Sequence, residues 1–351
     1  MNWDVALILS IDGLAGGAVY LLAGLGLVLV FSVTRVVFVP FGDVAAFAAL
    51  SLAAMEAGKL PATVGMVLTL AALTVAVEIV QALRQGEAAR IPRAILGWGV
   101  LPALPCLLAW SLAGTQVPTA VSIVAAVLLV IPIAPLIARL ALQPIADASV
   151  LVLLIASLAL HFLLSGMGLL FFGPEGFRTS PLVTGTLALP GGLAVSGQVL
   201  LMVSSAIVLS ALFFLAFERT VAGKALRATA VNRVGARLVG IRPARTALLA
   251  YTFSSLLAGL IGILIAPVMT MYYDSGFLIG LKAFVAAIIG GLVSYPLTAL
   301  GGIAVGMVES FGSFWSGALK DLIVFCLLIP ALLLRSALQS HPEEEQEEVD
   351  A

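Results

Sequence analysis

Residues 218–245 have the sequence ERTVAGKALRATAVNRVGARLVGIRPAR and separate two long apolar runs, 197–217 and 244–268. Seven of the 17 Lys and Arg residues of the chain fall in this loop, against one acidic residue, Glu218. The seven are Arg219, Lys224, Arg227, Arg233, Arg237, Arg242 and Arg245. A loop this basic cannot enter lipid, and between two membrane spans it is retained on the cytoplasmic side. The stretch therefore predicts a membrane protein and its orientation.

The composition of the whole chain agrees with this interpretation. Of its 351 residues, 62% are hydrophobic and 10% are charged, and the mean hydropathy is +1.20. A soluble domain carries about a quarter charged residues, so this chain has too few polar groups to cover a surface in water. We predict an all-α polytopic membrane protein. Cys106 and Cys326 lie in apolar runs with no His or second Cys nearby, which favours packing over a metal or redox role.

Apolar runs of sufficient length recur along the chain, because a helix needs about 20 residues to cross a bilayer core of about 30 Å. Two shorter stretches, 43–57 and 280–311, are interrupted or rich in glycine, and Pro296 helps to predict that the second forms a broken hairpin. The total is about ten membrane segments. The eight longer runs are 12–33, 61–83, 95–113, 117–138, 149–172, 197–217, 244–268 and 317–335.

The charges of the loops orient these segments. With the basic loop in the cytoplasm, alternation puts most of the other Lys and Arg residues on the same side, which supports the set of spans. The N-terminus is then outside and the C-terminus cytoplasmic. Residues 1–338 form the membrane domain. Residues 339–351 carry six acidic side chains, and a run of like charge that repels itself predicts a disordered cytoplasmic tail.

Within the basic loop the sequence predicts a short helix with its own ends. Asn232 is a good N-cap, Gly240 suits the left-handed position after a helix, and Pro243 cannot continue the helix. Upstream, Thr220 can cap a second short helix. The loop is therefore more structured than a simple charged connection.

The faces of this short helix differ in character. Val234 and Leu238 are four residues apart and share one face, whereas Arg233 and Arg237 share another. An apolar ridge flanked by guanidinium groups is a surface that a cytoplasmic protein can grip. The alternative is a solvated loop that rests on lipid headgroups.

Several stretches of the chain match one family pattern. Residues 223–240 contain ALRATAVNR and ARLVG and are followed by Ile241, residues 280–291 are GLKAFVAAIIGG, and 301–309 continue with GG and GMVE. Residues 17–31 are followed by Phe-Gly-Asp at 41–43. Together these stretches resemble the branched-chain amino-acid ABC transporter permeases. Residues 223–240 are similar to the coupling loop of that family, and residues 280–291 to its Gly-x-Lys-Ala-Phe…Gly-Gly segment. Residues 17–31 are similar to its first span, and residues 41–43 to its Asn-Phe-Ala-His-Gly-Glu segment.

The resemblance implies a permease subunit of the bacterial inner membrane that works with other proteins. These are two cytoplasmic ATPase subunits, a second permease subunit (identical or different) and a periplasmic substrate-binding protein. The ATPases would contact the coupling loop. The 351 residues contain no Gly-x-x-x-x-Gly-Lys-Ser/Thr phosphate loop, so energy must enter through a partner. The coupling residues that this implies are Arg227, Asn232, Arg233, Val234, Arg237, Leu238 and Gly240.

The sequence departs from the family in places that bear on function. Val39, Pro40 and Phe41 replace the Asn-Phe-Ala-His pattern, and Asp43 stands where the family has glutamate. Residues 84–115 look like an insertion that adds about one span. The ligand therefore stays open. A branched-chain or related amino acid leads, and urea, short amides and sugars are the alternatives.

Ionisable side chains within spans are candidates for the translocation path, because each costs about 2.5–3.5 kcal/mol to insert. Asp43 and Lys282 each follow a glycine-rich span, and these spans run in opposite directions. Inverted repeats, whose interrupted helices meet at the binding site, show this pattern; chance similarity is the alternative. We predict that the path is lined by Phe41, Asp43, Lys282, Phe284 and Glu309.

Structural explanations compete with that prediction. The side chains of Asp43 and Lys282 can instead anchor their helices at the membrane–water interface or form a structural ion pair. Glu309 and Asp321 can simply lie at the ends of spans. We expect Glu78 to contact water and His161 to form a hydrogen bond with a neighbouring helix.

These features predict the permease subunit of an ATP-driven importer for a small polar metabolite. A stand-alone secondary transporter or channel is the second hypothesis, but it would need more carboxylates deep in several spans. A membrane enzyme is the least favoured hypothesis, because no His/Asp/Glu or Ser/Lys cluster appears at catalytic spacing. We expect no cofactor, no metal ion and no nucleic acid among its ligands, and the lipid bilayer as its surroundings.

Overall fold

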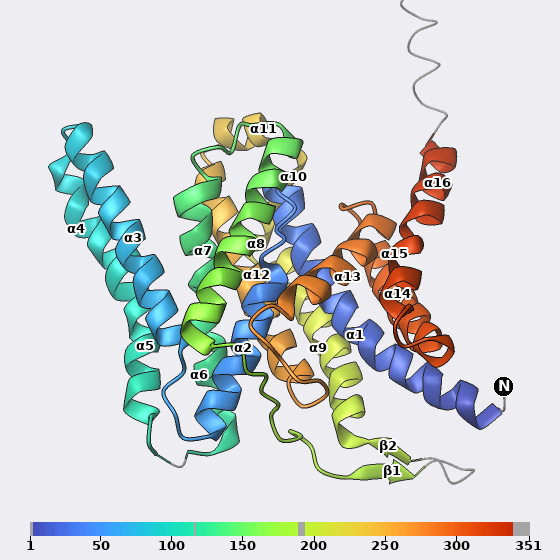
Figure 1. The fold of residues 1–351 in the computed structure, drawn as a ribbon. Helices are drawn as coiled ribbons and strands as arrows, with labels where there is room; N and C mark the ends of the chain where they lie inside the picture. Colours follow the sequence, from blue (N-terminus) through green and yellow to red (C-terminus); the bar gives the residue numbers. More distant parts are fainter. Residues whose placement is uncertain (1–2, 116, 189–193, 340–351) are drawn as a thin grey trace, which may run out of the picture.

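The computed structural model describes residues 3–115, 117–188 and 194–339, and in them the chain is almost wholly helical (Figure 1). Within this part of the chain, eight helical stretches are long and apolar enough to cross a membrane, which confirms the predicted all-α polytopic fold. They are α1 (Trp3–Thr34), α3 (Thr63–Arg84), Ala88–Leu112, Thr119–Leu142, α8 (Val150–Phe172), α9 (Gly197–Arg219), α12 (Pro243–Ile265) and α14 (Tyr295–Trp315).

Two of these stretches are composite. Prolines interrupt their hydrogen-bond ladders, and wider π-turns take up the mismatch. The first comprises η1 (Ala88–Arg90), α4 (Ile91–Ala94), the π-helical η2 (Ile95–Val100) and α5 (Leu101–Leu112). The second comprises α6 (Thr119–Val130), α7 (Ile133–Ile137) and the π-helical η3 (Ala138–Leu142).

The remaining elements are short. Strands β1 (Thr186–Ala188) and β2 (Ala194–Ser196) pair antiparallel at the lower edge of the molecule in Figure 1. The short helices are α2 (Phe41–Glu56), α10 (Val221–Val231), α11 (Arg233–Leu238), α13 (Gly276–Ile289), α15 (Lys320–Cys326) and α16 (Leu328–Gln339).

Helix α1 is the central element, and it packs most extensively against α14. Glycines on both helices allow the two backbones to come close. A Cβ on Gly17 would lie 2.8 Å from the Cα of Ile303, and one on Gly306 would overlap the backbone of Gly17. Small residues at such positions favour close helix packing in lipid.

The two short apolar helices α2 and α13 meet at their N-terminal ends. A Cβ on Gly42 would lie 2.8 Å from the carbonyl carbon of Gly276, so neither glycine has room for a side chain. In Figure 1, α2 runs downward from this meeting point and α13 runs upward. Each follows a long helix, α1 or α12, and these also run in opposite directions. This arrangement has the inverted pattern that the sequence suggested.

The region 280–311 forms the predicted broken hairpin: α13 and α14 are joined by a turn at 290–294. The prediction of one long span at 317–335 is wrong. That region contains α15 and α16, which are separated at Leu327. Pro330 lies in the first turn of α16 and has no N–H to donate to the carbonyl of Cys326, which weakens the hydrogen-bond ladder at the junction of α15 and α16.

The hairpin of α3 and α5 stands at one side of the molecule, with its upper end apart from the main bundle (Figure 1). An ion pair between Glu78 on α3 and Arg139 on η3 ties it to the bundle, and Arg139 also donates to Gln143 at 2.8 Å. Glu78, which we expected to contact water, is therefore mainly a partner of Arg139. The predicted acidic tail falls on residues 340–351, outside the described residues.

Candidate functional site

The basic loop folds as two capped helices, α10 and α11, at the upper end of the molecule in Figure 1. The N–H of Gly223 donates to Oγ1 of Thr220 at 3.0 Å, and the N–H of Gly235 donates to Oδ1 of Asn232 at 2.9 Å. Each bond satisfies one of the free donors in the first turn of a helix. Both predicted caps are confirmed.

The end of α11 is fixed in the same way. Gly240 has φ of +85°, its N–H donates to the carbonyl of Arg237 at 3.1 Å, and the N–H of Ile241 donates to the carbonyl of Ala236 at 2.9 Å. This pair of bonds is a Schellman motif, for which glycine is the favoured residue. The six-residue helix is thus held at both ends, and Ala236 packs inward.

Four apolar side chains at and around α11 face outward, and we call them the apolar ridge: Val231, Val234, Leu238 and Val239 are 82%, 67%, 84% and 75% exposed. Beside them, a shallow groove of about 430 Å³ runs between α10 and α11. An exposed apolar cluster with a polar rim is typical of a protein-interaction surface.

The guanidinium groups of the loop are placed in three different ways. Arg237 is exposed beside the ridge. Arg227 donates to Glu218 at 2.6 Å, and this hydrogen bond raises the pKa of Arg227, which keeps it charged. Arg233 is half-buried, and its Nε is shielded from solvent without a hydrogen-bond partner among the described residues. Of the pair expected to flank the ridge, only Arg237 is therefore fully available to a partner.

A buried polar pair lies where α2 and α13 meet. Asp43 in the first turn of α2 is fully buried, and its Oδ2 is 2.8 Å from Nδ1 of His161 on α8, which is 4% exposed. An ionised carboxylate only accepts, so Nδ1 is the donor. The expectation that His161 bonds to a neighbouring helix is confirmed. The ring of Phe277 stacks on His161 at a centroid distance of 4.6 Å.

The second oxygen of the Asp43 carboxylate, Oδ1, is free to accept a hydrogen bond. Oδ1 of Asp43 is buried and has no hydrogen-bond partner among the described residues. Buried polar atoms are nearly always paired in native proteins. An unpaired acceptor beside the N-terminal ends of α2 and α13 is suited to a donor that arrives from outside, such as an ammonium or amide group.

A second polar cluster joins α13 to the C-terminal helices. Lys282 is buried, and its Nζ donates to Oε1 of Glu309 at 2.6 Å and lies 2.8 Å from Oδ1 of Asp321. The hydroxyl of Tyr20 on α1 donates to Oε2 of Glu309 at 2.6 Å. The cluster therefore fits a structural ion-pair network, which is the alternative that the sequence left open for Lys282.

The predicted path residues are thus divided between two places. Asp43 belongs to the first cluster and Lys282 and Glu309 to the second, and the clusters share no residue. Phe41 is fully buried, with its ring against Gly26, and Phe284 is half-buried. The sequence analysis did not select Tyr20, because a single tyrosine in an apolar span gives no signal of its partner 289 residues away. Among the described residues, no group of three or more His, Cys, Asp or Glu could hold a metal ion.

Comparisons with known proteins agree with the fold. The family described as "Branched-chain amino acid transport system / permease component" matches residues 9–332. The chain is 28% identical over 219 residues to the high-affinity branched-chain amino acid transport system permease protein LivH of Salmonella typhimurium, covering 59% of this chain and 70% of the relative. LivH of Escherichia coli K12 gives the same values.

A further relative is BraD of Pseudomonas aeruginosa, also a high-affinity branched-chain amino acid transport system permease protein. It is 34% identical over 152 residues, covering 42% of this chain and 49% of BraD. No solved structure matches the chain. The family match and the eight long apolar helices make this a multi-pass inner-membrane protein and a transport subunit, not an enzyme. The chain belongs to the family of branched-chain amino acid transport system permease components.

Proposed function

We propose that this chain is the permease subunit of an ATP-driven importer for a branched-chain or related amino acid. Its α10–α11 loop binds a cytoplasmic ATPase and couples ATP hydrolysis to transport. Two ATPase subunits, a second permease subunit and a periplasmic binding protein complete the assembly. The concentration of positive charge in the loop supports a cytoplasmic position for α10 and α11 in this proposal, with the N-terminus outside and the C-terminus inside.

The apolar ridge carries this proposal. Four apolar side chains project from a pair of capped helices instead of packing inward. Exposed apolar surface of this kind is covered in an assembly. The 351 residues contain no phosphate loop, which supports a separate ATP-binding partner in this proposal.

Asp43 and His161 support the choice of ligand. The unpaired Oδ1 of Asp43 can accept from the ammonium group of an amino acid. Phe47 is fully buried one helical turn after Asp43, on the same face of α2, and an apolar neighbour of this kind suits an aliphatic side chain. LivH and BraD, by their names, transport branched-chain amino acids. The site departs from the family motif at Phe41 and Asp43, and related amino acids belong to the same proposal.

The docking assignment is tested by co-purification of the chain with the ATPase subunits of the proposed assembly. Replacing Val234 and Leu238 by serine removes the centre of the ridge. Each buried anchor of an interface is worth about 2 kcal/mol or more, so recovery of ATPase should fall more than tenfold. The control is Val221→Ser, because Val221 is 85% exposed on the same loop but outside the ridge. Undiminished recovery with the double variant would contradict the assignment.

A further inference from the structure

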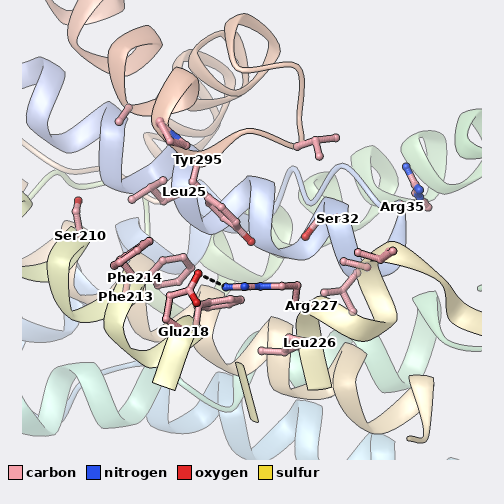
Figure 2. A pocket seen from close by; sticks show the side chains of 17 residues that line it. Leu25, Ser32, Arg35, Ser210, Phe213, Phe214, Glu218, Leu226, Arg227 and Tyr295 are labelled. Carbon is pink, nitrogen blue, oxygen red and sulfur yellow. Dashed lines mark hydrogen bonds and ion pairs between the residues drawn. The ribbon is translucent and has the colours of Figure 1, made fainter. Parts of the chain in front are cut away.

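A cavity of about 540 Å³ lies between α1, α9, α10 and the start of α14 (Figure 2). Its walls are mainly aromatic and aliphatic. Phe213 and Phe217 of α9 lie with ring centroids 4.5 Å apart, and Tyr295 of α14 is 5.8 and 5.9 Å from them. Phe214, which also lines the cavity, is 66% exposed, so the cavity reaches the outer surface of the helical bundle.

The cavity continues into a smaller and more polar one. This second cavity, of about 270 Å³, shares Ser32, Val33, Arg35, Ala230 and Val231 with the first. Its own lining adds Asn232 and Arg233. An apolar chamber that opens into a polar one has the form needed by an amphipathic ligand, with one end apolar and the other polar.

The charge of the two chambers is positive. Three guanidinium groups and one carboxylate line them: Arg35, Arg227, Arg233 and Glu218. Glu218 is paired with Arg227 at 2.6 Å, as the dashed line in Figure 2 shows, so these two cancel. Arg35 and Arg233 remain, and Nε of Arg233 is shielded from water with no acceptor among the described residues. A shielded guanidinium N–H requires an acceptor, and phosphate oxygens suit it well.

We propose that the two chambers bind one anionic phospholipid of the cytoplasmic leaflet. Its phosphate would accept hydrogen bonds from Arg35 and Arg233, and an acyl chain would lie against Phe213, Phe217 and Tyr295. Basic pockets between membrane helices on the cytoplasmic side are suited to anionic headgroups. A free phosphate would leave the aromatic chamber unfilled, and an apolar segment of another protein would leave the two cations without a partner. The observations therefore favour the lipid.

The bound lipid would connect elements that matter for coupling. Arg35 follows the cytoplasmic end of α1, whereas Arg233 is the first residue of α11. A phosphate held by both would fasten the α10–α11 loop to the central helix. This inference depends on the cytoplasmic position of the loop but not on the identity of the transported ligand or on ATPase binding.

Native mass spectrometry of the delipidated chain in detergent tests the inference without any partner. Phosphatidylglycerol and phosphatidylcholine with identical acyl chains are titrated separately. We expect at least tenfold tighter binding of one phosphatidylglycerol. The double variant Arg35→Gln, Arg233→Gln should lose this preference. The matched control Arg237→Gln, Arg242→Gln removes the same charge from exposed positions of the loop and should keep it.

A second variant separates headgroup from chain recognition. Ala299 lines the apolar chamber, and Ala299→Phe should fill it and weaken the binding of both lipids. If the double arginine variant fails to fold, Arg35→Gln and the charge-retaining Arg35→Lys are compared instead. Equal affinity for the two lipids would overturn the proposal. So would competition by inorganic phosphate at lipid-like concentrations, or a second copy of the chain that Ala299→Phe displaces.

Discussion

Asp43 is the most demanding residue of this protein in energetic terms, because its carboxylate is fully buried and one oxygen is unpaired. Its bond to His161 joins positions 118 residues apart, from α2 to α8. Breaking a buried pair by removing one partner is strongly destabilising, whereas removing both costs much less. The pair therefore makes a distinctive prediction for mutants.

His161→Leu should lower the free energy of unfolding by about 3–5 kcal/mol, because it leaves the Asp43 carboxylate buried without a donor. Adding Asp43→Leu to that variant should recover part of the loss, which a double-mutant cycle of unfolding in mixed micelles measures. Additive effects of the two substitutions would show that they do not interact. Asp43→Asn alone should fold but should lose transport of the amino acid, because the carboxylate whose Oδ1 is proposed to accept a hydrogen bond from the ammonium group of the ligand is gone.

Lys282 presents the opposite arrangement, with one cation and two carboxylates. Lys282→Met should destabilise the chain by about 3 kcal/mol, the lower end of the range for a broken buried pair, because the Asp321 side chain is 33% exposed and keeps access to water. Thermal unfolding of Lys282→Met beside Tyr20→Phe measures this. Tyr20→Phe removes a single hydrogen bond to a charged group, worth about 1.5–3 kcal/mol. An unchanged melting temperature for Lys282→Met would contradict the network.

At the scale of elements, the contact between α1 and α14 depends on the absence of side chains. Gly13, Gly17, Gly302 and Gly306 each lie where an added Cβ would meet the backbone of the other helix. This spacing lets two apolar helices pack closely in a medium that gives no hydrophobic drive for their association. The arrangement also brings Tyr20 on α1 to Glu309 on α14.

Gly306→Leu should force α14 away from α1 and destabilise the protein by at least the 1–3 kcal/mol typical of overpacking, because the obstacle is backbone. Gly166→Ala on α8 is the matched control. A Cβ there meets nothing within 4 Å, and alanine is about 1 kcal/mol better than glycine in a helix. Differential scanning fluorimetry should show the first variant melting lower and the second unchanged or higher. If both melt alike, close packing is not what holds α1 to α14.

Some of these elements could be predicted from the sequence, and others could not. The short apolar stretch 43–57 correctly indicated the helix α2, and the glycines of 280–311 correctly indicated the turn between α13 and α14. Asn232 and Gly240 marked both ends of α11. The apolar run 317–335 led to the wrong prediction of a single span, because mean hydropathy does not reflect the missing N–H of Pro330. Long-range pairs such as Asp43–His161 could not be derived, since a helical pattern defines which face a residue occupies but not which helix faces it.

At the scale of the whole molecule, the Asp43–His161 pair and the α10–α11 loop occupy different levels of one helical bundle. The α2–α13 meeting point lies at the middle of the molecule and the α10–α11 loop at its upper end (Figure 1). Helix α12 begins just after α11 and packs against α2, so it provides a continuous connection between them. A displacement of the α10–α11 loop would therefore be passed to α12, which packs against the helix that carries Asp43.

Uptake of a radiolabelled branched-chain amino acid into ATP-loaded proteoliposomes is the most direct measurement of this account. The vesicles would contain this chain, the second permease subunit and the ATPases, with the binding protein outside. We predict uptake that requires ATP and falls at least tenfold with the Val234→Ser, Leu238→Ser variant. Vesicles containing this chain alone should accumulate nothing, and accumulation by the chain alone on an ion gradient would contradict the account.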